Sequence, residues 1–143
     1  VAVPSWREPS LDRTEVGAPV RVLRGRARHV VTEIARTRTA EAAIRAGDLP
    51  ALGRVFAASH ASMRDDFEIT VPAVDALVAA LAQAIGEQGG ARMTGGGFGG
   101  AVVAVLPASE VPRVSAAVRA NYQTPDGAPL DIRHEQPGGS TPE

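Results

Sequence analysis

Three stretches of the chain repeat apolar residues at the spacing of an α-helix. The clearest runs from Pro72 to Gly86, a second covers residues 49–65, and a third covers residues 20–46. In each, apolar residues recur every three or four positions, as expected for a helix with one face on the core. The predicted core positions are Val74, Leu77, Val78, Leu81 and Ile85; Leu52, Val55, Phe56, Ser59 and Met63; and Ala27, Val30, Val31, Ile34, Ala40, Ala43 and Ile44.

Residues that start and stop helices flank these three stretches. Pro19 suits the first turn of the first helix, because proline has no N–H to lose there. Gly47 is a plausible C′ residue, and Asp48 can cap the next helix. Thr70 can cap the third helix, with Pro72 in its first turn. The chain is therefore expected to open with three consecutive helices.

The second half of the chain predicts strands and a further helix. The aliphatic run at 101–106 ends at Pro107 and is typical of a buried strand, and residues 91–94 form the strand before it. Residues 110–122 have helical spacing, and residues 130–133 alternate apolar and charged side chains as a half-buried edge strand does. This order predicts an α+β domain of two layers, with helices on one face of a small antiparallel sheet.

Composition limits the size and the function of the domain. The 143 residues suffice for one hydrophobic core, but aromatic residues make up only 3%, so aliphatic side chains must fill it. We expect an extended lead-in at residues 1–18, the domain at 19–135 and a disordered tail at 136–143.

Charge and residue content exclude several classes of partner. A net charge of -1 gives no field that attracts nucleic acid, and single-stranded nucleic acid also requires aromatic side chains for stacking. The absence of cysteine excludes disulfides and zinc–thiolate sites and fits a cytoplasmic protein. No apolar run approaches the roughly 20 residues of a membrane span. We therefore expect neither nucleic acid nor a membrane as partner.

A glycine-rich loop between the two predicted strands is the main candidate site. Gly95, Gly97 and Gly100 fit the spacing G-x-G-x-x-G, but that dinucleotide-binding motif must open a helix, whereas a strand follows here. No Lys-Ser or Lys-Thr follows the glycines, so the loop is no Walker A motif. Two interpretations remain open from the residues alone: a loop whose N–H groups bind an anion such as a phosphate, or a β-turn without a ligand.

A cluster of charges marks the end of the second predicted helix. His60 and Arg64 are four residues apart and share one face, and Asp65, Asp66 and Glu68 follow. One interpretation is the rim of a binding site, where an aspartate pairs with Arg64 and positions a loop. The other is a solvated cluster of charges that ends the helix.

Three segments of this sequence together resemble the GHMP small-molecule kinases, and among them the galactokinases. They occur in the order and near the spacing of that family, which makes the resemblance more specific than one glycine motif. The segments are residues 28–33 (Arg-His-Val-Val-Thr-Glu), 59–69 (Ser-His-Ala-Ser-Met-Arg-Asp-Asp-Phe-Glu-Ile) and 92–100 (Arg-Met-Thr-Gly-Gly-Gly-Phe-Gly-Gly).

The resemblance implies the ferredoxin-like C-terminal domain of such a kinase, which transfers a phosphoryl group from Mg²⁺-ATP to the anomeric hydroxyl of galactose. It implies a cofactor role for the glycine loop, which would support the main phosphate loop of an N-terminal kinase half. Sugar and nucleotide are then partners of the complete enzyme only. The residues with this implied cofactor-binding role are Thr94, Gly95, Gly96, Gly97, Phe98, Gly99 and Gly100.

The sequence also departs from the family. Ala101 stands where cysteine is common and Phe67 where tyrosine is usual. The two motifs that carry catalysis and the main ATP contacts in the family have no counterpart here, so no catalytic residue and no metal ligand are assigned. The chain alone is expected to be inactive. The alternative is a truncated or free-standing α+β module that binds a protein or a small ligand without catalysis.

Overall fold

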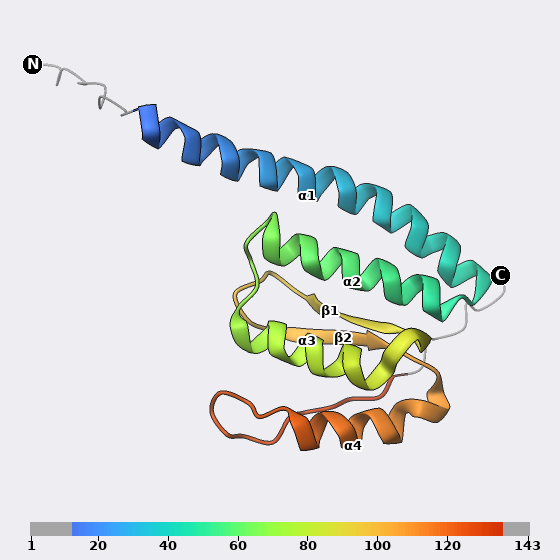
Figure 1. Ribbon diagram of the computed structural model, residues 1–143. Helices are drawn as coiled ribbons and strands as arrows, with labels where there is room; N and C mark the ends of the chain where they lie inside the picture. Colours follow the sequence, from blue (N-terminus) through green and yellow to red (C-terminus); the bar gives the residue numbers. More distant parts are fainter. Residues whose placement is uncertain (1–12, 136–143) are drawn as a thin grey trace, which may run out of the picture.

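A computed structural model describes residues 13–135 of the chain, with four α-helices and a two-stranded sheet in that range (Figure 1). The predicted α+β class is confirmed. The helices are α1 (Arg13–Ala46), α2 (Leu49–Asp65), α3 (Pro72–Ile85) and α4 (Val111–Asn121), the strands are β1 (Gly90–Thr94) and β2 (Ala101–Val105), and 3-10 turns cover Gly86–Gln88 and Ala108–Glu110.

The elements stack in a simple order. Strands β1 and β2 pair antiparallel, with Gly90 opposite Val105 and Thr94 opposite Ala101. Helices α2 and α3 pack on β1, α4 packs on α3, and α1 lies along the outer side of α2 (Figure 1). The glycine loop therefore leaves the sheet at the end where the α2–α3 connection also lies.

The hydrophobic core lies between α2, α3, α4 and the sheet. The side chain of Met93 is fully buried at its centre, and Tyr122 and Leu130 pack against the core from the chain around and after α4. Aliphatic side chains and two methionines fill it, as the low aromatic content predicts. The buried members are Met63, Val74, Val78, Ile85, Ala91, Met93, Val114 and Val118.

A Schellman motif makes the tight turn between α1 and α2. Gly47 has a φ of 65°, and its N–H and that of Asp48 donate to the carbonyls of Ile44 and Ala43 at 3.1 and 2.9 Å. The Asp48 carboxylate then accepts the N–H of Ala51 at 2.8 Å as the cap of α2. Both roles predicted for Gly47 and Asp48 are confirmed.

Helix α1 begins at Arg13, so the prediction of an extended lead-in to residue 18 is wrong from that residue on; residues 1–12 lie outside the described residues. Pro19 lies inside the helix rather than in its first turn. A proline there removes one hydrogen bond of the helix and leaves the rest of the ladder in place. The prediction gave Gly17 and Pro19 too much weight as helix breakers.

Of the apolar residues predicted to bury one face of α1, Ala43 is buried, but Val30, Val31, Ile34 and Ile44 point away from the core, which contradicts the prediction for them. Val31 and Ile34 are 67% and 55% exposed. The face of α1 that meets α2 carries polar residues instead, among them His29 and Glu33, which bond to serines of α2 at 3.0 and 2.8 Å. The 3.6-residue period identified the helix correctly but not which of its faces is packed.

Two further predictions are wrong. Residues 130–133 form no strand, because the chain after α4 pairs with neither β1 nor β2, although Leu130 still packs on the core. Thr70 does not cap α3, since its hydroxyl donates to Asp75 at 3.1 Å and Val71 occupies the cap position. The tail predicted at 136–143 lies outside the described residues.

Alanine substitutions at two helical glycines test how closely α2 packs on the sheet. A Cβ at Gly53 would lie 1.8 Å from the carbonyl oxygen of Gly89, whereas one at Gly17 meets no atom within 4 Å. We expect Gly53→Ala to lower the free energy of unfolding by about 1–3 kcal/mol. Gly17→Ala should raise it by up to about 1 kcal/mol through helix propensity. Chemical denaturation measures both, and stabilisation by Gly53→Ala would contradict the packing described.

Candidate functional site

The loop that joins β1 to β2 has a backbone suited to glycine. Gly95, Gly97, Gly99 and Gly100 have φ values of 96°, 90°, 131° and 96°. Side chains with a Cβ rarely adopt these values. Phe98 has a φ of 57° in the same loop, an uncommon conformation for a residue that is not glycine. The predicted site residues from Gly96 to Gly100 thus form one tight curve.

One side of the glycine loop rests on the connection between α2 and α3. The N–H of Phe98 donates to the carbonyl oxygen of Ile69 at 2.7 Å. A Cβ at Gly97 would lie 2.8 Å from the Cβ and 2.9 Å from the carbonyl oxygen of Ile69. This contact makes glycine necessary at position 97 and holds the loop in a fixed place. Nothing in the residue pattern around Ile69 had indicated this role.

The other side of the loop is open. An added Cβ at Gly95, Gly96 or Gly99 would meet no atom within 4 Å. Within residues 13–135, the N–H groups of these three glycines have no backbone or side-chain acceptor. Successive unpaired N–H groups in a turn can form a concavity that attracts anions. The structure thus brings the predicted site residues Thr94 to Gly100 together and leaves room beside them; their role in cofactor binding stays a prediction.

His60 anchors the strand that leads into the loop. It is 5% exposed, and its Nδ1 accepts the N–H of Met93 at 3.3 Å. Its Nε2 must therefore carry the proton of the neutral ring. Nε2 lies 3.0 Å from Oδ1 of Asp75 on α3, close enough for electrostatic attraction but without the angle of a good hydrogen bond. His60 thus connects α2, α3 and β1.

Burial determines the charge of this histidine. It disfavours the protonated ring and lowers the pKa of His60, and the nearby Asp75 carboxylate offsets only part of that effect. The ring is therefore neutral near pH 7. Because His60 is buried and Arg64 exposed, the two do not form the shared polar surface that their spacing suggested.

The charges at the end of α2 divide into two groups. Arg64 forms a two-point pair with Asp65, at 2.7 and 2.9 Å, but the pair is solvated, as in the second interpretation of this cluster, and it lowers the pKa of Asp65. Both side chains are exposed, so the pair adds little stability. Asp66 turns instead towards α1, where Arg28 lies 3.1 Å away, and accepts from Ser62 at 3.0 Å.

Helix α1 holds the connection on which the glycine loop rests. The ring of His29 stacks on Phe67 with centroids 4.7 Å apart, and the Arg26 guanidinium lies 5.0 Å from the centre of the Phe67 ring. Arg26 also donates to the Phe67 carbonyl at 2.7 Å. His29 Nδ1 lies 3.0 Å from the Ser62 hydroxyl, which gives its own proton to Asp66. These contacts of His29 and Arg26 with Phe67 were not predicted from the sequence.

A second cluster joins α1 and α2 to β1. The Glu33 carboxylate accepts from Arg36 and from Ser59, and Arg92 of β1 lies 3.7 Å away. Burial alone would raise the pKa of Glu33, but the hydrogen bonds from Arg36 and Ser59 and the charge of Arg92 more than offset it, so this pKa is lowered. Glu33 is therefore charged in the folded protein.

The described residues contain no group of three or more His, Cys, Asp or Glu side chains that could hold a metal ion. In the same range of 13–135, no helix combines the length and the apolar character needed to cross a membrane.

Comparison with known proteins identifies the family of this domain. The family model "GHMP kinases C terminal" matches residues 40–124, and the chain belongs to this family. The crystal structure of Lactococcus lactis galactokinase complexed with galactose is similar, with 40% sequence identity and a TM-score of 0.67. That match covers 76% of this chain but spans only 28% of the galactokinase chain.

Alanine at two neighbouring glycines tests whether the loop is fixed by Ile69. Gly97→Ala introduces a Cβ against Ile69 at a φ of 90° and should lower the free energy of unfolding by about 1–3 kcal/mol. Gly96→Ala meets no atom within 4 Å, its φ is not in the positive region, and it should change that energy by less than about 0.5 kcal/mol. Thermal and chemical unfolding measure both variants. Equal effects of the two substitutions would mean that Ile69 does not support the loop.

Proposed function

We propose that this chain is the C-terminal portion of a galactokinase-type sugar kinase, which transfers a phosphoryl group from ATP to the anomeric hydroxyl of galactose. The glycine loop carries this proposal. Its open side offers N–H groups without acceptors, and its other side is fixed by Ile69. Phosphoryl transfer depends on positioning and on stabilising charge around the phosphates, and a rigid, open loop of N–H groups can contribute to both.

The described residues fit the phosphates of ATP but not the Mg²⁺ ion. Gly95, Gly96 and Gly99 leave space and donors for anionic oxygens, and no carboxylate occurs between Thr94 and Gly100. A hard divalent ion needs oxygen ligands such as carboxylates. We propose that Mg²⁺, the main phosphate loop and the catalytic groups belong to the N-terminal half of the kinase, which is then the principal partner of this chain. Bound Mg²⁺-ATP would supply the phosphoryl group.

Within this division of roles, the loop orients the nucleotide and takes no part in the chemical step. The backbone N–H groups of Gly95, Gly96 and Gly99 hold the phosphate end of the nucleotide beside Thr94, and no side chain of the loop can take up a proton from the sugar. Phe98 is 74% exposed and is available to contact the other half. We place the enzyme in the cytoplasm, in galactose metabolism.

A free-standing module without catalysis is less well supported. The 40% identity with the galactokinase extends over 76% of this chain, well beyond the glycine loop. A ligand-binding module that shared only the loop would not need identity over so much of the chain.

A chimera tests the proposal. In it, this chain replaces the matched segment of Lactococcus lactis galactokinase, which supplies the remaining parts of a kinase. With galactose and Mg²⁺-ATP the chimera should release ADP at a rate in the usual enzyme range, about 1–10³ s⁻¹. A coupled ADP assay measures the rate.

The controls for this assay are the chimera without galactose and this chain alone, and both should show no turnover. A chimera that folds cooperatively but releases no galactose-dependent ADP would contradict the proposed function. Turnover by this chain alone would contradict the division of roles between two halves.

A further inference from the structure

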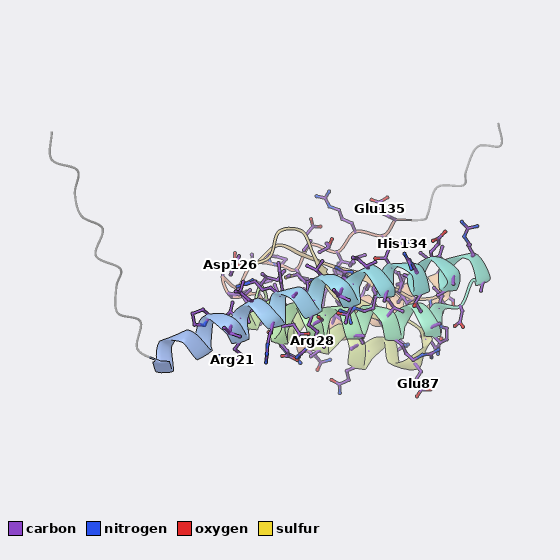
Figure 2. The ribbon with its side chains drawn as sticks, turned by 90° about the horizontal axis from the view of Figure 1, so that it is seen from above. Arg21, Arg28, Glu87, Asp126, His134 and Glu135 are labelled. Atoms are coloured by element: carbon purple, nitrogen blue, oxygen red, sulfur yellow. The ribbon has the colours of Figure 1, made fainter. Side chains whose placement is uncertain are left out.

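We infer that the outer face of α1 is a docking surface for the remainder of the kinase chain; this inference rests on the proposed function. The face carries an apolar stripe of five side chains that no described element covers. Viewed from above, α1 lies in front of α2, and its N-terminal part extends beyond the other elements (Figure 2). The stripe consists of Val20, Leu23, Val30, Val31 and Ile34, which are 44%, 67%, 51%, 67% and 55% exposed.

The stripe is continuous and long enough for a specific contact. Its members recur at helical spacing over 15 residues, which corresponds to roughly 21 Å along one side of the helix. Single exposed apolar side chains are common, but contiguous apolar surfaces of this kind mark interaction sites.

The stripe cannot turn inward, because α1 is fixed by its opposite face. Glu33 accepts from Ser59 of α2 at 2.8 Å, and His29 stacks on Phe67. Gly25 packs so closely that a Cβ there would lie 2.6 Å from the carbonyl oxygen of Asp66. Rotating α1 to bury the stripe would break these contacts, including the hydrogen bond between the Glu33 carboxylate and Ser59. These contacts therefore keep the polar face of α1 turned towards α2.

The comparisons indicate which molecule covers the stripe. The family model of the C-terminal domain matches residues 40–124, so residues 20–34 lie outside the part that defines this domain. The similar galactokinase has a further 72% of its chain beyond the matched 28%. If this chain serves in such a kinase, α1 is the element that lies between the common C-terminal domain and the rest of the enzyme.

Charges beside the stripe indicate the chemistry of its partner. Among the described residues, neither Arg24 nor Arg38 has a carboxylate within ion-pair distance, and both are exposed next to the stripe. Arg21 also projects from the side of α1 (Figure 2), whereas the charge of Arg28 is matched by Asp66 at 3.1 Å. A second copy of this chain would bring arginines against arginines. A segment with apolar residues at its centre and acidic residues at its rim fits better.

Substitutions in the chimera test the docking surface. Val31→Gln/Ile34→Gln changes the stripe, and Ile44→Gln is the matched control, because Ile44 is an exposed residue of the same helix (64%) that lies outside the stripe. Glutamine is a better helix former than valine or isoleucine, so neither variant should unfold α1. The readouts are the Tm and the ADP release rate of the chimera, and the Tm of this chain alone.

We expect the double variant to lower both the Tm of the chimera and its ADP release rate. The control variant should have the same Tm and rate as the unsubstituted chimera. This chain alone should keep its Tm in all three forms. An equal Tm for both variants in the chimera would overturn the inference, and so would a chimera that unfolds without coupling between its parts. A fall of the Tm in this chain alone would show that the chain covers its own stripe, which also overturns it.

Two further outcomes separate the possible occupants and the two proposals. A dimer of this chain that sediments as such and dissociates in the double variant would assign the stripe to a second copy and overturn the inference. A chimera in which the double variant lowers the Tm, but no variant releases ADP, would support the docking surface and contradict the proposed kinase function.

Discussion

The close contact of α2 with the first residues of β1 is the constraint on which the rest of the structure depends. At Gly53 the helix approaches Gly89 and Gly90 so closely that no side chain fits between the two backbones. Two turns further along α2, His60 accepts the N–H of Met93 from inside the core. These two contacts fix the position and the register of β1 against α2. The glycine loop begins at Gly95, immediately after the last residue of this strand.

A second line of contacts fixes the far side of the loop. Helix α1 holds Phe67 by stacking and by a hydrogen bond from Arg26, and two residues later Ile69 accepts the N–H of Phe98. Glu68 and Phe98, the two described residues other than glycine with positive φ, lie at this junction. Such backbone conformations persist only where the surroundings hold them, and they gather at functional sites. The loop is therefore rigid on one side and open on the other, as an anion site requires.

Local rules of the sequence predicted much of this arrangement, since they act between residues a few positions apart. Helix α2, the cap at Asp48, the turn at Gly47 and the strand–loop–strand unit all follow from such rules. The rotation of α1 did not, because it depends on bonds from His29 and Glu33 to residues 26 to 33 positions away. Periodicity shows that a helix has an apolar face, but not whether that face meets the core or a partner. The missing strand at 130–133 has the same cause, since alternation indicates half-burial and not a pairing partner.

The central claim is that the open side of the glycine loop faces the phosphates of a nucleotide. NMR of the chimera labelled with ¹⁵N-glycine, titrated with Mg²⁺-ATP in the absence of galactose, tests it most directly. The account predicts that the amide signals of Gly95, Gly96 and Gly99 shift in a saturable way, while those of Gly53 and Gly89, buried between α2 and β1, stay in place. Saturation of the chimera with nucleotide without a shift of the three loop signals would contradict it.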